Sequence, residues 1–546
     1  MLDLWYKNAI VYGLSVASYV DSDEDGTGDF RGLTRRLDHL SRLGVNCIWL
    51  LPFYPSPRRD YGYDVSDYYG VHPSCGSLGD FVEFSRAARE RGMRILVDLV
   101  VNHTSDQHPW FQAARANPRS RFRDYYVWSG HEPRDADKGV AFPGHQQSVW
   151  TYDDRVGAWY FHRFYHYQPD LNLMNPAVRE EIDRIMGFWL ELGVSGFRID
   201  AAPFLIEEVH PDGKVERHFD ILRGMREFVS WRRGDAVLLA EANVAADSIS
   251  DYFGPSDGDR MHMLFAFIAN QYLFLALARR RAEPLVRGLR LGPQPPPLGL
   301  WAQFLRHHDE LDLSRLTEDE RQEIYAAFAP DPDMRLFGRG IRRRLASMLG
   351  GDRRRIELAY SLLYSLPGTP VLYYGEEIGM GEDLSLPERW PLRTVMQWSS
   401  GHNAGFSDAP SDKLIHPAID RGPFGAQCVN VADQQRDPDS LLNWLRRLHD
   451  VRSSCPEVGS GTFATIDTDR PSVFAHGYRL HDRSLLLLHN LDEHPVAVEL
   501  AETAFRHGPL VDLFGNELYA PCKGTTAPIE IDGFGYRWLR TDPLPG

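Results

Sequence analysis

The sequence predicts an α/β fold: a (β/α)8 barrel of the TIM type, with an insertion after the third strand and a C-terminal antiparallel β-sandwich. Two observations predict the barrel over about the first 455 residues. Segments with apolar residues at helical spacing alternate with short apolar runs, and a glycine separates helix from strand. Residues 43–48 and 192–197 show this same unit. Its repetition is typical of a parallel sheet covered by helices.

The individual elements follow from these patterns in chain order. Leucines three and four residues apart over 33–43 predict an amphipathic helix that Gly44 ends. Similar spacing predicts helices at 81–88 and 176–189, the second one beginning at Pro176 after Asn175. Eight strands are expected, at 9–14, 45–51, 94–101, 196–200, 236–240, 263–267, 301–305 and 369–372.

Changes in composition along the chain divide it into domains. The barrel is assigned to 1–103 and 173–455, and the aromatic-rich segment 104–172 to an inserted subdomain B. A charged segment at 311–355 is interpreted as a helical insertion over the active site. Short β-rich runs separated by turns predict a β-sandwich domain at 456–546. The proline-rich stretch 293–297 suggests only a connection.

Composition excludes several classes of protein. With 43% hydrophobic and 12% aromatic residues, the chain is neither disordered nor fibrous. A formal charge of −16 gives no electrostatic basis for binding nucleic acid or an anionic membrane. The longest apolar run, 263–278, contains two amides and is too short to span a bilayer, so we interpret it as a strand followed by a buried helix.

The cysteines and the N-terminus favour a cytoplasmic location. Five cysteines, far apart and without a CxxC pair, predict neither a disulfide framework nor a zinc site. Cys47 lies in an apolar strand and is expected in the core. The N-terminal residues have no signal-peptide pattern. We expect a soluble cytoplasmic protein without an organic cofactor, and a homo-oligomeric state is left open.

An acidic loop follows the first strand. Asp21, Asp23, Asp25 and Asp29 alternate with other residues, and two glycines permit a tight turn. Oxygen ligands at alternate positions suit a hard cation such as calcium, although an EF-hand would have Glu where Gly32 stands. The alternative is a solvated acidic loop, in which the carboxylates repel one another. We favour the metal site.

Acidic residues recur at the ends of the predicted strands. Asp98 lies in the third strand, Asp200 ends the fourth, Glu241 follows the fifth and Asp309 follows the seventh. A single strand-end acid has an ordinary alternative role, such as capping the next helix or pairing with Arg198. Several acids from different strands converge on one cavity in a barrel, and paired carboxylates beside a sugar-sized cavity predict glycoside hydrolysis or transfer.

These residues lie in motifs that resemble the signature regions of the α-amylase superfamily. The motifs are Asp98 with Asn102-His103, 196–200, 239–243, His308-Asp309, 60–64 and 168–172. Within the superfamily the chain most resembles the trehalose synthases, which are maltose–trehalose glucosyl isomerases. This likeness rests on 51–57, 100–111, 308–311, 340–344, 373–380 and 396–398.

The resemblance implies a retaining double displacement on a small α-glucoside. Asp200 is then the nucleophile, Glu241 the general acid and base, and Asp309 the residue that holds the ring hydroxyls. Glu241 needs a raised pKa, whereas Asp200 must stay ionised with help from Arg198 on the same strand face. The residues expected to bind the donor glucose are Asp60, Tyr63, His103, Arg198, His308 and Arg393.

The resemblance also implies a structural Ca²⁺ or Mg²⁺ ion in the acidic loop. Its ligands are expected to be Asp21, Asp23, Asp25, Asp29 and the carbonyl of Thr27.

The sequence departs from the family pattern where the acceptor sugar is expected. His307 stands where Asn is usual, Val395 stands where proline is usual, and the segments 13–19 and 386–398 differ in character. These changes spare the three carboxylates. The first hypothesis is therefore conversion of maltose to trehalose with side hydrolysis. The alternatives are an exo-acting α-glucosidase or transglucosylase acting on maltose, trehalose or sucrose and, more remotely, an inactive binding subunit.

Overall fold

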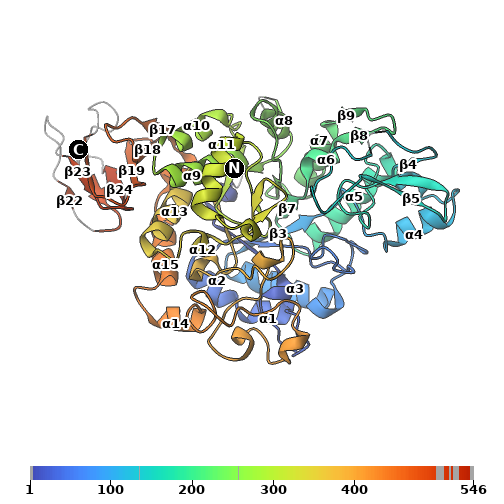
Figure 1. Cartoon of the computed structure of the whole chain (residues 1–546), viewed down its shortest axis with the longest axis horizontal. Coiled ribbons are helices and arrows are strands. Elements are labelled where there is room, and N and C mark those ends of the chain that lie inside the picture. Colours follow the sequence, from blue (N-terminus) through green and yellow to red (C-terminus); the bar gives the residue numbers. More distant parts are fainter. Residues whose placement is uncertain are drawn as a thin grey trace.

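The computed structural model describes residues 4–134, 136–255, 258–499, 510–515, 518–519 and 528–541. Its centre is a closed barrel of eight parallel strands in the order β1-β16-β12-β11-β10-β7-β3-β2. Figure 1 labels two of them, β3 and β7, near the middle of the molecule. All eight coincide with predicted segments. They are β1 (Val11–Leu14), β2 (Cys47–Leu50), β3 (Arg94–Leu99), β7 (Gly196–Ile199), β10 (Val237–Ala240), β11 (Met263–Phe265), β12 (Leu300–Phe304) and β16 (Thr369–Tyr373).

The barrel strands are apolar because both of their faces are buried. Every residue of β2, β7, β10 and β16 is buried, since side chains fill the interior and helices cover the outside. Gly196 allows β7 and β10 to approach closely. A Cβ at this position would lie 2.1 Å from the carbonyl oxygen of Val237, and the backbone φ of +150° disfavours other residues.

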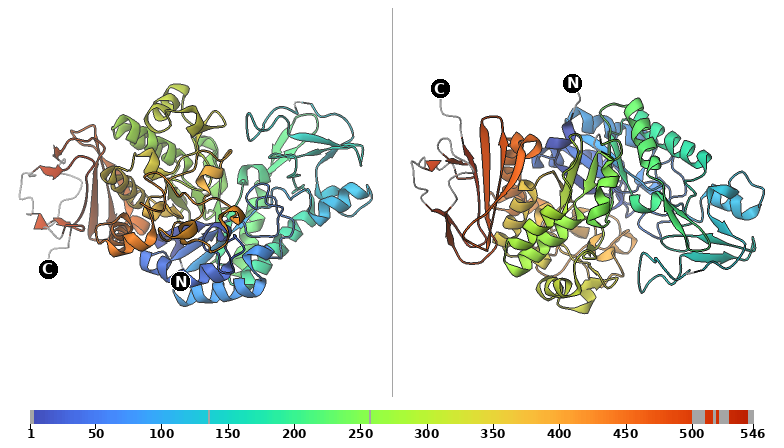
Figure 2. Two further views of the ribbon diagram at one scale, coloured as in Figure 1. Left: turned by 60° about the horizontal axis from the view of Figure 1, so that its bottom comes forward. Right: turned by 90° about the horizontal axis from the view of Figure 1, so that it is seen from above.

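Helices surround the barrel (Figure 2). The predicted helix over 33–43 is divided at Arg36 into α1 (Phe30–Arg35) and α2 (Leu37–Leu43), and Gly44 ends α2 in a left-handed conformation. Asn175 caps α5 by accepting a hydrogen bond from the Ala177 N–H, as the Asn-Pro start predicted. Together with α5, the helices that cover the barrel include α3 (Leu78–Glu90), α5 itself (Pro176–Glu191), α7 (Asp220–Arg232), α8 (Ile249–Phe253), α9 (Phe267–Arg279), α10 (Glu283–Leu291), α13 (Arg353–Ser365) and α15 (Leu441–Ser453).

The segment between β3 and α5 forms a small antiparallel sheet. It consists of α4 (Pro109–Ala116) and the strands β4 (Trp128–Ser129), β5 (Trp150–Asp153) and β6 (Ala158–Phe161), with β6 in the middle. Figures 1 and 2 show it at the opposite end of the molecule from the C-terminal strands. A second, shorter hairpin of β8 (Glu207–Val209) and β9 (Val215–Arg217) follows β7.

The segment after β12 is only partly helical, so its interpretation as a helical insertion is incomplete. It contains α11 (Glu318–Phe328) and α12 (Leu345–Met348), but also β13 (Leu311–Asp312), β14 (Arg335–Leu336) and β15 (Gly340–Ile341). These strands pair antiparallel in the order β13-β15-β14. Strands of two residues are too short to show an alternating pattern in the sequence.

The C-terminal residues form antiparallel sheets, as predicted. A six-stranded sheet has the order β17-β18-β19-β24-β21-β22, and β20 pairs with β23 beside it. Val473, Leu488, Val498 and Ile531 belong to one apolar cluster between the two sheets. Parts of the predicted sandwich domain, at 500–509, 516–517, 520–527 and 542–546, lie outside the described residues. The strands are β17 (Thr462–Ile466), β18 (Val473–Leu480), β19 (Arg483–Asn490), β20 (Val496–Val498), β21 (Leu510–Asp512), β22 (Leu518–Tyr519), β23 (Ile529–Ile531) and β24 (Tyr536–Thr541).

The long apolar run at 263–278 is the strand β11 followed by the buried helix α9, as expected. Within the described residues, none of the helices combines the length and the apolar character that a bilayer crossing requires. The four described cysteines, Cys47, Cys75, Cys428 and Cys455, are free thiols, and Cys47 is buried in the core.

Candidate active site

The barrel brings the predicted acidic residues to one rim. Asp98 lies on β3, while Asp200, Glu241 and Asp309 come just after β7, β10 and β12. Because these strands are parallel, their carboxyl ends meet at the same end of the barrel. Asp200, Glu241 and Asp309 all line one cavity of about 520 Å³. The arrangement therefore satisfies the central requirement of the predicted chemistry.

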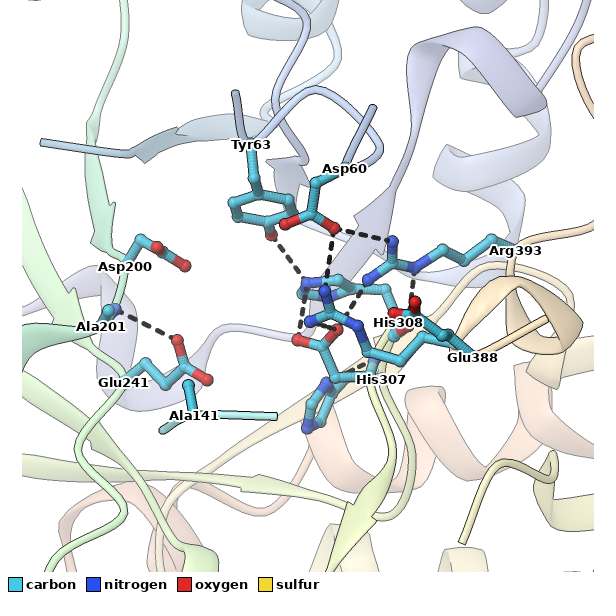
Figure 3. Close-up of polar contacts among 12 residues, drawn as sticks. Asp60, Tyr63, Ala141, Asp200, Ala201, Glu241, His307, His308, Glu388 and Arg393 are labelled. Atoms are coloured by element: carbon cyan, nitrogen blue, oxygen red, sulfur yellow. Dashed lines mark hydrogen bonds and ion pairs between the residues drawn. The ribbon is translucent and has the colours of Figure 1, made fainter. Parts of the chain in front are cut away.

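One buried arginine holds three of the carboxylates together. Arg198 donates hydrogen bonds to Asp98 at 2.6 Å, to Glu241 at 2.7 Å and to Asp200. Glu241 also accepts a hydrogen bond from the Ala201 backbone N–H at 3.2 Å (Figure 3). Two neighbouring nitrogens of one guanidinium thus fix the carboxyls of Asp200 and Glu241 on the same wall of the cavity.

Burial dominates the protonation of this Arg198 cluster. It raises the pKa of Glu241 to about 7, although Arg198 opposes the shift. Glu241 therefore meets the requirement for a general acid near neutral pH. Burial also raises the pKa of Asp200 to about 7 and that of Asp98 to about 6, and in both cases Arg198 opposes the rise, as expected of a cation that favours the ionised nucleophile. One guanidinium charge does not fully compensate three buried carboxylates, which favours a shared proton within the cluster.

The opposite side of the cavity has the reverse balance of charge. Asp309 accepts hydrogen bonds from Arg389 at 2.9 Å and Arg393 at 2.7 Å, and lies 3.0 Å from His308 Nε2. Arg389 also donates to Asp60 at 2.8 Å. Burial alone would raise the pKa of Asp309, but His308 and the two arginines hold it well below its usual range. Asp309 is therefore a fixed negative charge.

The predicted sugar-binding residues fall into two groups. Asp60, Tyr63 and His103 line the cavity. His308 lies behind Tyr63, away from the cavity. Its Nε2 atom is 2.7 Å from the Tyr63 hydroxyl, and its imidazole stacks on the Tyr63 ring. His308, Arg393 and Arg198 are almost completely buried and do not line the cavity. Through their hydrogen bonds, these three residues orient the side chains that face the cavity.

Comparison with known proteins agrees with this site. A family model described as alpha amylase, catalytic domain, matches residues 14–285 and 339–461. The chain belongs to the α-amylase family. The trehalose synthase of Pimelobacter sp. is 41% identical over 99% of this chain and 96% of its own length. The trehalose synthase/amylase TreS of Mycolicibacterium smegmatis is also 41% identical, over 99% of this chain and 94% of its own length.

The fold comparison leads to the same family. The crystal structure of the alpha-amylase from H. orenii matches with a TM-score of 0.79 and 27% identity, covering 98% of this chain and 100% of that one. The chain is thus an α-amylase family enzyme with a (β/α)8 barrel and a C-terminal antiparallel sheet.

Several cavity residues were missed by the sequence analysis. Arg389, which bridges Asp60 and Asp309, lies in the segment 386–398 that departs from the family pattern. Glu310 faces the cavity beside Asp309, and burial raises its pKa to about 7. Among the described residues, its carboxylate pairs only with its own backbone N–H. Glu310 lies within the motif 308–311 and Arg389 within the unusual segment 386–398, but the sequence analysis assigned neither residue to the cavity.

His307, the residue that replaces the usual Asn, also lines the cavity. Its Nδ1 accepts a hydrogen bond from the Asp309 backbone N–H at 3.1 Å. Because burial lowers its pKa well below the usual value, the imidazole is neutral at physiological pH. His307 therefore orients Asp309 without adding charge to the cavity.

The acidic loop brings only part of the predicted metal set together. Carboxylate oxygens of Asp21, Asp23 and Asp29 lie within 4.8 Å of one another. The Asp25 carboxylate is outside this group, where it accepts a hydrogen bond from the Thr27 N–H at 2.7 Å. Burial and the charges of its neighbours raise the pKa of Asp23. Three converging carboxylates fit a hard divalent cation, which would relieve their repulsion.

Proposed function

We propose that this α-amylase family enzyme is a retaining glucosyltransferase that converts maltose into trehalose, with hydrolysis as a side reaction. One observation carries the proposal: Asp200 and Glu241 are held by the same guanidinium on one wall of a cavity that Asp309 faces. The choice of trehalose as product is supported by two relatives named trehalose synthase, each of which is 41% identical over 99% of this chain.

In the first step the Asp200 carboxylate attacks the anomeric carbon of the glucosyl unit. Glu241 donates its proton to the leaving glycosidic oxygen, and the bond between that oxygen and C1 breaks. The products are a β-glucosyl ester on Asp200 and a free glucose. Asp309, fixed in its charged form, binds hydroxyls of the glucosyl ring as it flattens toward the oxocarbenium-like transition state.

In the second step the freed glucose turns and presents its anomeric hydroxyl to the ester. Glu241, now a carboxylate, removes the hydroxyl proton while the new C1–O bond forms and the bond to Asp200 breaks. The product is trehalose and the enzyme returns to its starting protonation state. Glu310 is the free carboxyl on the cavity wall that we assign to binding the turning glucose.

The alternative is an exo-acting α-glucosidase or transglucosylase, in which water or another sugar replaces the retained glucose. Its support is the departure from the family pattern at His307 and 386–398, both of which contribute residues to the cavity. The same three carboxylates serve both reactions, so only the acceptor differs.

Product analysis separates these functions. Purified enzyme is incubated with maltose, trehalose and sucrose in separate reactions, and all sugars are identified by chromatography. We expect trehalose from maltose, maltose from trehalose, and a minor amount of glucose. Glucose as the sole product from maltose would establish a hydrolase, and new oligosaccharides would establish transfer to another acceptor. The Asp200→Asn variant is the blank for every substrate.

We also propose that Asp21, Asp23 and Asp29 hold a structural Ca²⁺ or Mg²⁺ ion, supported by the convergence of their carboxylates. Thr27, close by in the same loop, would contribute its carbonyl. Such an ion would brace the loop and take no part in bond cleavage. A reducing, cytoplasmic compartment completes the proposal, because the four described cysteines are free thiols.

A further inference from the structure

A second cavity, of about 560 Å³, lies in the side of the barrel. Its walls come from α10, from β11 and β12, and from Phe463 and Tyr478 near the start of the C-terminal sheet. The proline-rich loop 293–297, to which the sequence analysis gave no role, forms part of its rim. Gln294 and Pro297 in this loop are exposed, so the cavity is open to solvent.

The helix that follows β10 is short, and it borders the cavity. The helices α3, α5, α7, α9 and α13 have 13 to 16 residues, whereas α8 has five. Ile249, the first residue of α8, reaches the cavity wall.

Two apolar residues separate this cavity from the substrate cavity. Val244 and Phe267 line both of them. The Phe267 ring packs against Phe304, with centroids 5.2 Å apart, and edge-on against His307 at 6.3 Å. Val244 and Phe267 thus form a partition between the two cavities. His307, which replaces the usual Asn, packs against Phe267 in this partition. Apolar side chains offer no hydrogen-bond partners that would hold water in this wall.

We propose that Val244 and Phe267 are specificity-determining residues, because they keep water in the second cavity away from the glucosyl group on Asp200. This inference rests on the proposed glucosyl transfer. With a disaccharide in the substrate cavity, the partition stands between the ester and the solvent that enters the second cavity. Exclusion of water is what makes the retained glucose the favoured acceptor.

Transfer and hydrolysis compete for the same intermediate. In hydrolysis a water oxygen attacks C1 of the glucosyl ester, Glu241 takes the water proton, and the bond from C1 to the Asp200 oxygen breaks. Two molecules of glucose then leave for each disaccharide. A gap in the partition raises the water concentration at C1 but leaves the first step unchanged. The ratio of glucose to trehalose is therefore the quantity that reports on the partition.

The test compares Phe267→Ala and Val244→Ala with the wild-type enzyme on maltose. We expect the ratio of glucose to trehalose to rise several-fold in Phe267→Ala, less in Val244→Ala and most in the double variant. The release of nitrophenol from an aryl α-glucoside in the first turnover is measured in parallel, because it reports any change in the first step separately from the ratio of products. Phe267→Leu, which preserves bulk without an aromatic ring, should restore the wild-type ratio.

The matched control is Phe463→Ala, which enlarges the second cavity from its far wall without touching the partition. An unchanged ratio in both Phe267→Ala and Val244→Ala would overturn the inference, as would an equal rise in Phe463→Ala. If Phe267→Ala is unstable, the ratio of glucose to trehalose in Val244→Ala, compared with that in Phe267→Leu, tests the inference instead. A wild-type enzyme that releases only glucose would overturn the proposed transfer and, with it, the need for a partition.

Discussion

The two sides of the substrate cavity differ in how they balance charge. On one side, Asp98, Asp200 and Glu241 share the single cation Arg198. On the other, Arg389 and Arg393 surround Asp309, and Arg389 also pairs with Asp60. The first side has too few cations for its carboxylates and the second has nearly enough. Both sides are buried to a similar degree.

This difference separates proton transfer from charge stabilisation. Burial raises a carboxyl pKa unless a cation compensates it, so the Arg198 side holds an exchangeable proton near pH 7. The pKa of Asp309 is lowered instead, and its charge persists across the physiological range. An enzyme that must donate a proton and also stabilise positive charge on a sugar requires both environments within one cavity.

The largest effect is expected for Asp200→Asn, which removes the nucleophile. Turnover of maltose should fall on the order of 10⁴-fold or more, as when a nucleophile is removed from other enzymes. The fold should persist, because the amide replaces a buried carboxyl whose charged form is disfavoured. Initial rates and a thermal melt measure both. Activity close to wild type would remove Asp200 from its assigned role.

Glu241→Gln removes the proton donor from the same side of the cavity. We expect turnover of maltose to fall about 10²–10⁴-fold, the usual contribution of general acid catalysis. Formation of the glucosyl ester from an aryl α-glucoside should be much less affected, because its leaving group needs no proton. Comparing the two substrates under pre-steady-state conditions tests this. Equal losses on both would argue against the acid role.

On the other side, Arg389→Met removes one of the two cations that hold Asp309 and Asp60. Loss of charged hydrogen bonds worth about 1.5–3 kcal/mol should lower kcat/KM roughly 10–100-fold. The pKa of Asp309 should rise, so the loss should deepen toward acidic pH. A pH series of kcat/KM measures this. An exposed control, Arg421→Met, should have no effect, since its side chain is 92% exposed.

The comparison also predicts the pH profile of the wild-type enzyme. With the pKa of Glu241 raised to about 7, rising pH removes the catalytic proton, and kcat/KM for maltose should fall on the alkaline side. With the pKa of Asp200 also about 7, falling pH protonates the nucleophile, and the rate should fall on the acidic side. The maximum should lie near pH 7. With an aryl α-glucoside, kcat/KM should show the same fall on the acidic side but a weaker fall on the alkaline side, because its leaving group needs no proton.

The smallest effect is expected far from both sides, at the acidic loop. Treatment with EDTA should lower the melting temperature without changing the ratio of products, because Asp21, Asp23 and Asp29 lose a shared cation. Added calcium or magnesium should restore the melt, and the better of the two identifies the ion. In Asp23→Asn the response to EDTA should be diminished. An unaltered melt in the wild-type enzyme would count against the metal.

The sequence by itself determined the barrel, its eight strands and the convergence of Asp200, Glu241 and Asp309. It could do so because apolar periodicity and strand-end position are local properties, and a parallel barrel brings strand ends together. The motif likeness then supplied Asp60, Tyr63 and His103, which line the cavity.

Only the tertiary structure decided how charge is distributed around those residues. Arg389 lies 80 residues beyond Asp309 in a loop without recognisable periodicity, yet it pairs with both Asp309 and Asp60. The protonation of Asp200 depends on burial and on sharing Arg198 with two other acids, which no local pattern encodes. The partition by Val244 and Phe267 likewise arises from packing between distant segments. Electrostatic balance and solvent access depend on separations in space, and these become defined only when the chain is folded.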